Sequence, residues 1–390
     1  MDRQINTMYY FIRFFVRMAL KIYCSRILVN DKSPLKSKGP LILASNHPNS
    51  FLDAIIIASC FREPVHFLAL GEMTDKFLFR PVMDAFHIIP VYRLKDKDEN
   101  QDLNEKSFSI CVDVLLKNGI VLIFSEGISE NKWQLRPIKK ITARITMVAM
   151  NQESLRSKLQ IQPIGINYNS FDQPGKTVLI QFAEPILIKD RLTGNTEAEK
   201  IQSLNILLRE YFNDMVLQTE KLPEKAQFLV SNRSPVHSCK IKDLQDKLNE
   251  ESNQTYFSKL EKPGYMVSPS QTFSRSLIMV LLLAVPGIIG WISHVFLYYP
   301  LKIFIGRKTG GSAYHDSAMF TILFFTYPVY WIFCNILGFI FFKNAWIQVL
   351  LICMPVFALI TIYWKISIQK IQNYFILTSG ERTLLKGYFS

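Results

Sequence analysis

The sequence lacks the features that mark secreted, metal-binding and covalently acting proteins. Its six cysteines are scattered and form no Cys-x-x-Cys pair, which suits a reducing compartment and predicts neither a disulfide framework nor a zinc site. Basic residues interrupt every apolar run near the N-terminus, so no secretory signal peptide is expected. The sequence also has no Gly-x-Ser-x-Gly elbow and no cluster of metal ligands, so we expect no metal or other cofactor.

Long blocks of positive charge are missing as well. The formal net charge is +13 and the isoelectric point is near 9.3, values that suit nucleic acid, an anionic membrane or an anionic substrate. Lysine and arginine occur singly or in pairs, and no nucleic-acid-binding motif is present. We therefore expect a membrane or an anionic substrate as partner, and no nucleic acid.

Hydrophobic residues make up 49% of the chain and concentrate toward its C-terminus. Apolar stretches occupy residues 277–301, 318–342 and 345–364. The second and third are long enough to cross a bilayer, because about 20 apolar residues span the hydrocarbon core. Pro286-Gly287 divides the first into shorter pieces, which predicts a re-entrant or interfacial segment.

The positions of basic residues predict the orientation of an integral membrane protein. If only the last two stretches span, the basic residues Lys302, Arg307 and Lys308, the C-terminal tail and the large soluble domain all face the cytoplasm. This arrangement obeys the positive-inside rule, whereas three spans would violate it. We therefore predict a cytoplasmic soluble domain.

Residues 38–182 alternate short apolar runs with longer helical patterns, which predicts an α/β domain. Because the strands lack strict alternation, we expect a twisted, largely parallel sheet with helices on both faces. The predicted strands are 41–44, 65–70, 88–92, 120–124, 161–166 and 178–182, and the predicted helices are 48–60, 103–117 and 138–150.

The flanking segments complete the predicted organisation. Residues 9–29 predict a helix with Arg13, Arg17 and Lys21 on one side, which suits either a segment in the headgroup layer or a surface helix packed on the core. The predicted parts are an N-terminal amphipathic membrane-interface helix (1–30), the α/β domain (31–216), a polar linker with helices (217–272), a membrane region (273–372) and a cytoplasmic tail (373–390).

A histidine and an aspartate stand out at the end of the first predicted strand of this domain. Pro48 suits the first position of a helix, which places His47 at the strand-to-helix junction and Asp53 in the second turn. Helical side chains lean toward the N-terminus, so Asp53 is expected to reach back to His47. Such a pair fixes the imidazole tautomer and leaves the other nitrogen to accept a proton from an alcohol. A merely packed or capping histidine is the alternative.

Four segments together resemble a known family. Asn46-His47-Pro48-Asn49-Ser50-Phe51-Leu52-Asp53, Ile89-Pro90-Val91-Tyr92-Arg93, Phe124-Ser125-Glu126-Gly127 and Gln162-Pro163-Ile164-Gly165-Ile166 are similar, in this order, to the motifs of the glycerol-3-phosphate and 1-acylglycerol-3-phosphate acyltransferases. The five residues between histidine and aspartate, and the segment 135–139, look like the fungal dual-specificity glycerol-3-phosphate/dihydroxyacetone-phosphate subgroup. The sequence departs from the family at Ser125, at Ile128-Ser129 and at Ile141.

The resemblance implies a membrane-bound O-acyltransferase of phospholipid synthesis. His47 would be the general base and Asp53 its orienting partner, while Arg93 and Lys139 would bind the acceptor's phosphate and Glu126 and Gly127 would shape the same pocket. The donor would be a thioester of coenzyme A or of acyl carrier protein. The acceptor (glycerol 3-phosphate, dihydroxyacetone phosphate or lysophosphatidate), the chain length, the acylated position and the oligomeric state stay open.

Two other hypotheses compete with this one. The chain could be an inactive lipid-binding or scaffold protein with an acyltransferase-like domain, although the set of motif residues is intact. It could also be a transporter component, which would require ionisable residues within the spans, and His294 is the residue of this kind in the first stretch.

Overall fold

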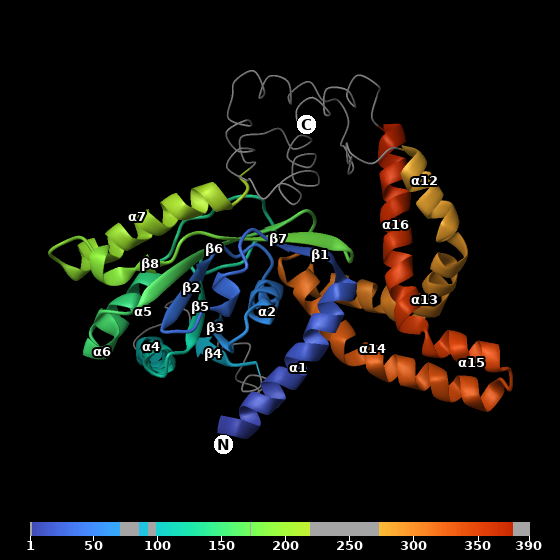
Figure 1. Ribbon diagram of the computed structural model, residues 1–390, viewed down its shortest axis with the longest axis horizontal. Helices are drawn as coiled ribbons and strands as arrows, with labels where there is room; N and C mark the ends of the chain where they lie inside the picture. Colours follow the sequence, from blue (N-terminus) through green and yellow to red (C-terminus); the bar gives the residue numbers. More distant parts are fainter. Residues whose placement is uncertain (1, 71–85, 93–98, 172, 219–272, 377–390) are drawn as a thin grey trace. The chain divides into compact units, whose positions relative to one another are not determined.

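The computed structural model describes residues 2–70, 86–92, 99–171, 173–218 and 273–376 (Figure 1). Its strands are β1 (Cys24–Val29), β2 (Leu41–Ser45), β3 (Val65–Leu70), β4 (Ile88–Val91), β5 (Ile120–Phe124), β6 (Gln160–Tyr168), β7 (Lys176–Phe182) and β8 (Ile186–Leu187). Its helices are α1 (Asp2–Tyr23), α2 (Phe51–Cys60), α4 (Glu99–Leu116), α5 (Ile141–Met150), α6 (Glu153–Arg156), α7 (Glu197–Met215), α12 (Phe273–Leu282), α13 (Ala284–Thr309), α14 (Tyr314–Phe341), α15 (Ala345–Ile352) and α16 (Met354–Ile376).

The strands form one eight-stranded sheet in the order β1-β7-β6-β2-β5-β3-β4, with β8 paired to β6. Strand β2 runs parallel to both β5 and β6, and β3 runs parallel to β4 and β5, whereas β8 is antiparallel. The predicted α/β fold with a largely parallel sheet is therefore confirmed. The six predicted strands lie where the sequence indicated, because each is a compact apolar run bounded by polar residues or turns.

Both faces of the central strands are covered. Ile42 and Val121 pack in a core with side chains of α4, α5 and α7, such as Leu115 and Leu208. The alternate residues, such as Leu43 on β2, point to the opposite face and are also fully buried. Burial on both faces explains why these strands lack alternating polar residues.

The N-terminal helix differs from its prediction in length and orientation. It ends at Tyr23, and the predicted helical residues 24–29 form strand β1 instead, because they pair at the edge of the sheet. Arg13 donates hydrogen bonds to the carbonyls of Phe61 and Arg62, and Arg17 donates to the carbonyl of Ser59, at 2.6–2.7 Å. These two arginines therefore bind carbonyls in the last turn of α2 and just after it, and they do not form a stripe facing lipid headgroups.

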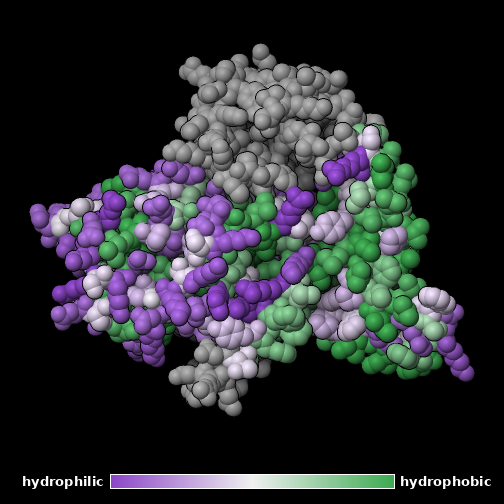
Figure 2. Space-filling view, viewed as in Figure 1, coloured by the Kyte–Doolittle hydropathy of each residue, from purple (hydrophilic) through white to green (hydrophobic). Residues whose placement is uncertain are grey.

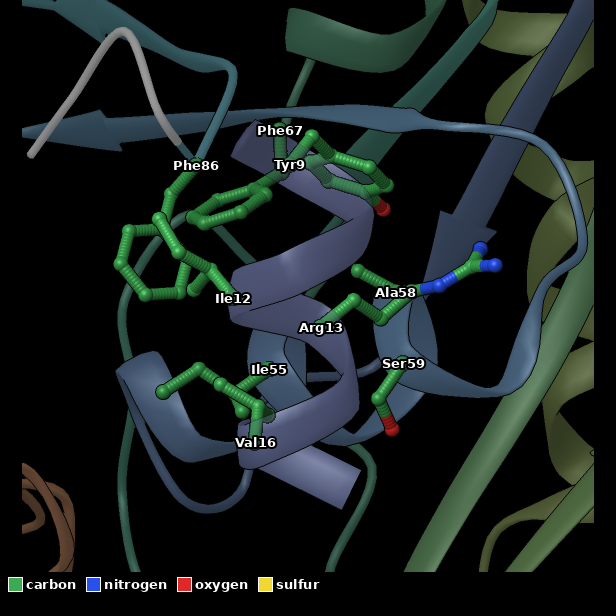
Figure 3. A pocket seen from close by; sticks show the side chains of 9 residues that line it. All are labelled: Tyr9, Ile12, Arg13, Val16, Ile55, Ala58, Ser59, Phe67 and Phe86. Carbon is green, nitrogen blue, oxygen red and sulfur yellow. The ribbon is translucent and has the colours of Figure 1, made fainter. Parts of the chain in front are cut away.

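The inner side of α1 packs against α2 along an apolar seam. Figure 3 shows Tyr9 and Val16 of α1 opposite Ile55 and Ala58 of α2, with Phe67 closing one end. Tyr9 and Val16 are only 5% and 4% exposed. The other side of the helix leaves large apolar side chains exposed: Met8, Tyr10, Phe11, Phe14, Phe15 and Met18.

The chain divides into two compact units. The first comprises Met1–Met18, Leu28–Asn167 and Leu179–Gln218, and the second comprises Ala19–Ile27, Tyr168–Val178 and Thr219–Ser390. The C-terminal helices therefore share a unit with short segments that lead into or out of the sheet. Most of the predicted linker 217–272 and of the predicted tail 373–390 lies outside the described residues.

A buried ion pair lies within the second unit. Lys176, at the start of β7, forms an ion pair with Asp316 in the first turn of α14, and both side chains are almost completely buried. The ammonium also donates to the carbonyl of Phe171 at 2.7 Å, and the Tyr23 hydroxyl donates to the second carboxylate oxygen of Asp316. Buried charges need such partners, so this network satisfies both ions.

The C-terminal helices carry a hydrophobic surface, as Figure 2 shows. Helices α13 and α14 are each long and apolar enough to cross a membrane. Helices α15 and α16 are separated by a short break at which the chain bends by 63°, and together they would make a third candidate span. The expected interruption near Pro286 lies at Leu283, but the helix then continues for 26 residues to Thr309, longer than the expected pieces. The third apolar stretch, expected to be continuous, is the one that bends.

Candidate active site

The candidate site lies where β2 and β5 end side by side. Ser45 and Phe124 are register partners at the ends of these parallel strands, and His47 follows two residues after Ser45. The His47 imidazole stacks on the Phe124 ring with centroids 3.8 Å apart and planes 14° apart. The carboxyl ends of parallel strands commonly form ligand sites, and this position keeps the histidine at the edge of the core.

His47 and Asp53 form the expected contact. The imidazole Nδ1 lies 2.9 Å from Asp53 Oδ2, with the aspartate side chain fully buried and the histidine side chain 16% exposed. The same carboxylate oxygen accepts a hydrogen bond from the backbone N–H of Asn49 at 2.8 Å. In the neutral imidazole, a hydrogen on Nδ1 would point to this carboxylate, and Nε2 would then be the acceptor.

The local path of the chain differs from its prediction. Helix α2 begins at Phe51 and not at Pro48, with Ser50 as the preceding residue at φ 51°, a conformation uncommon for residues other than glycine. Asp53 therefore lies in the first turn of the helix. The loop 46–50 curves back over that turn and brings His47 to the carboxylate, so the contact depends on the loop as well as on the lean of the side chain.

Glu126 is buried and contacts the backbone around the histidine. It is 3% exposed, and its carboxylate accepts the backbone N–H groups of His47 and Arg136, each at 2.9 Å. The Arg136 guanidinium donates to Glu126 Oε2 at 2.8 Å and to the carbonyl of His47 at 3.3 Å. Sequence reasoning missed Arg136, although a buried glutamate in an apolar strand end requires a cationic or N–H partner nearby.

The remaining predicted site residues follow β5 or lie beyond the described residues. Gly127 has φ 72°, and a Cβ there would lie 3.1 Å from Lys139 Cγ, so glycine suits both the turn and the close approach. Lys139 is exposed, and its backbone N–H donates to the carbonyl of Ser125 at 2.7 Å. The structure thus brings Glu126, Gly127 and Lys139 to the same loop region, while Arg93 is outside the described residues.

Two other histidines of the same unit form a separate pair. His66 Nε2 lies 3.0 Å from His87 Nδ1. Burial, and secondly the neighbouring His87, lower the pKa of His66 to about 4, so this imidazole is a weak base. Within the described ranges there is no group of three or more ligating side chains that could hold a metal ion.

A histidine held by a buried aspartate at the end of a parallel sheet is an arrangement that can carry out general-base chemistry on a hydroxyl group. The sequence comparison makes the class more specific, because residues 26–167 match the Acyltransferase family. This segment contains the loop of His47 and Asp53 and the loop of Glu126 and Lys139. The family match therefore covers both loops of the candidate site.

Other comparisons are more distant. No curated protein matches the sequence. Among solved structures, the 1-acyl-sn-glycerophosphate (LPA) acyltransferase PlsC from Thermotoga maritima is similar, with a TM-score of 0.38 and 13% sequence identity. The aligned region covers 54% of this chain and 82% of that chain. The resemblance to the fungal dual-specificity subgroup stays a prediction.

Proposed function

We propose that the protein is a membrane-bound O-acyltransferase that moves a fatty acyl group from a thioester donor to a hydroxyl of glycerol 3-phosphate or lysophosphatidate. The His47–Asp53 pair, inside the segment that matches the Acyltransferase family, carries this proposal. Lys139, together with Arg93, would supply positive charge for the acceptor's phosphate. The donor would be an acyl thioester of coenzyme A or of acyl carrier protein, and membrane lipids would be further partners.

The reaction would be a direct transfer. His47 Nε2 takes the proton from the acceptor hydroxyl while its oxygen attacks the thioester carbonyl, which forms a tetrahedral intermediate. The carbon–sulfur bond then breaks, the new ester forms, and the proton passes from the imidazole to the departing thiolate. Asp53 stabilises the imidazolium that exists between these steps.

An acceptor panel tests this proposal. Purified protein in phospholipid vesicles is given labelled acyl-coenzyme A or acyl carrier protein with glycerol 3-phosphate, dihydroxyacetone phosphate or lysophosphatidate. We expect esterification of at least one acceptor, with glycerol 3-phosphate favoured by the resemblance to the dual-specificity subgroup. If none of the acceptors is esterified with either donor, the inactive scaffold replaces the enzyme as the better hypothesis.

We also propose that the exposed side of α1 lies in the membrane interface on the cytoplasmic side. The two arginines of its basic side are engaged with α2, so the remaining side presents Phe11, Phe14 and Phe15, which are 64%, 60% and 46% exposed. Exposed aromatic side chains on an amphipathic helix suit the boundary between headgroups and acyl chains. Helices α13 and α14 would tether the same chain to that bilayer.

Photocrosslinking measures this contact directly. A photoreactive benzoylphenylalanine at Phe14 is expected to crosslink to phospholipid when the protein is reconstituted in vesicles. The matched control is the same residue at Ile206 on α7, a similarly exposed apolar position at 53%, which is expected to crosslink little. Equal lipid crosslinking at the two positions, or none at Phe14, would contradict an interfacial α1.

A further inference from the structure

Arg136 and Glu126 hold the two peptide groups that flank the Cα atom of His47. Glu126 Oε2 accepts the N–H of His47 at 2.9 Å, and Arg136 Nη2 donates to the carbonyl of His47 at 3.3 Å. The same Nη2 atom donates to Glu126 Oε2 at 2.8 Å, so the two side chains also bind each other. The backbone of the histidine is thereby fixed on both sides by one ion pair.

The ion pair is itself well enclosed. The side chain of Arg136 is 14% exposed and that of Glu126 is 2% exposed. In addition to the ion pair, the backbone N–H of Arg136 donates a hydrogen bond to Glu126 Oε1 at 2.9 Å. Charge-assisted hydrogen bonds of this kind are shorter and stronger than neutral ones, and shielding from water strengthens them further. Glu126 therefore accepts three hydrogen bonds from protein atoms and is placed to organise the loop.

The loop after β5 holds the histidine loop at further points. Ser125 N–H donates to the carbonyl of Ser45 at 2.8 Å, and the Ser129 hydroxyl accepts the N–H of Ser50 at 2.6 Å. Ser50 adopts a positive φ of 51°. A non-glycine residue keeps this unfavourable backbone conformation only where surrounding contacts stabilise it. The hydrogen bond from Ser50 to Ser129 in the loop after β5 is one such contact.

From these contacts, and on the basis of the proposed acyl transfer, we infer that Arg136 is a positioning residue for the reaction. It acts through Glu126 and the His47 backbone and sets where the imidazole Nε2 meets the acceptor hydroxyl. Arg136 would then affect the rate of the chemical step and not the affinity for either substrate. A displacement of about 1 Å of a catalytic group costs about 10²-fold in rate, which sets the expected magnitude.

The experiment compares Arg136→Gln and Arg136→Lys with the wild type in the reconstituted enzyme. Arg136→Gln is expected to lower kcat about 10²-fold and leave the KM of both substrates within about twofold, the pattern of a group that acts only in the transition state. The lysine variant keeps a cation able to donate to Glu126 and to the His47 carbonyl, so it is expected to recover part of the loss. Arg144→Gln, an exposed arginine on α5, is the matched control.

A second measurement separates this inference from the proposed function. Modification of His47 by diethyl pyrocarbonate, followed by peptide mass spectrometry, reports the exposure of the imidazole without requiring activity. We expect faster modification in Arg136→Gln than in the wild type or in Arg144→Gln. If the wild type transfers no acyl group, the proposed function fails while this comparison still tests the contact.

Three results would overturn the inference. An unchanged kcat together with an unchanged modification rate in Arg136→Gln would show that the histidine loop does not need the arginine. A raised KM for the phosphorylated acceptor with little change in kcat would instead make Arg136 a substrate ligand. Equal losses in Arg136→Gln and Arg144→Gln would indicate a general effect of removing a cation.

Discussion

Replacing His47 by alanine is expected to lower kcat for acyl transfer by about 10²–10⁴-fold, the usual contribution of general acid–base catalysis. The imidazole has the geometry of a base held in one tautomer, with Nδ1 at 2.9 Å from a fully buried carboxylate. Its removal leaves no other base on the described part of the histidine loop. The measurement is single-turnover transfer to the best acceptor of the panel, which isolates the chemical step from product release.

The control for this variant is His66→Gln. His66 belongs to the same unit, contacts His87 and is a weak base because burial lowers its pKa to about 4. We expect its replacement to leave the rate of transfer close to that of the wild type. Full activity in His47→Ala would remove the histidine from the mechanism and leave the family match of residues 26–167 as the remaining support for an acyltransferase.

Removing one partner of the buried Lys176–Asp316 pair is expected to cost about 3–5 kcal/mol of stability. In Lys176→Met, Asp316 would remain buried without its cation, and in Asp316→Leu the buried ammonium would keep the Phe171 carbonyl as an acceptor and the Tyr23 ring nearby but would lose its counter-charge. Such an uncompensated charge is the physical reason for the loss. Unfolding of the detergent-solubilised protein, followed by circular dichroism, provides the measurement.

The double variant Lys176→Met with Asp316→Leu makes this prediction specific. Apolar residues of similar volume remove both charges together, so we expect the double variant to be more stable than either single one. The exposed pair Lys132–Glu130, at 2.6 Å, is the matched control, and Lys132→Met is expected to change stability by less than about 1 kcal/mol. A double variant as unstable as the sum of the single variants would mean that the side chains act by packing and not as an ion pair.

The buried pair also concerns the C-terminal helices. Asp316 lies in the first turn of α14, and Lys176 and Tyr23 belong to segments that lead directly into the sheet. Within the second unit, α14 is thus held to these two segments by a buried ion pair and a hydrogen bond. His294 does not support the transporter hypothesis, because both of its ring nitrogens are engaged by protein groups. These groups are the Ser293 hydroxyl, the Gly290 carbonyl and the Tyr327 hydroxyl.

Features that depend on neighbours along the chain were predictable from the sequence alone. The strands appear as apolar runs of four to eight residues because burial on both faces demands them. The His47–Asp53 contact was also predictable, since six positions along the chain keep the two side chains within reach of each other. The apolar composition of 277–364 likewise identifies helices able to enter a membrane, because length and hydropathy are local properties.

Only the tertiary structure decided which distant residues meet. Glu126 and Arg136 approach His47 from a second strand and its loop, and Lys176 meets Asp316 across 140 positions. Ser50, just before α2, donates its N–H to Ser129 in the loop after β5, and Arg13 donates to the carbonyl of Phe61 just after α2. Secondary-structure propensity and hydrophobic periodicity depend only on residues close together in the sequence. These contacts instead form because the parallel sheet brings the ends of separate strands and helices together.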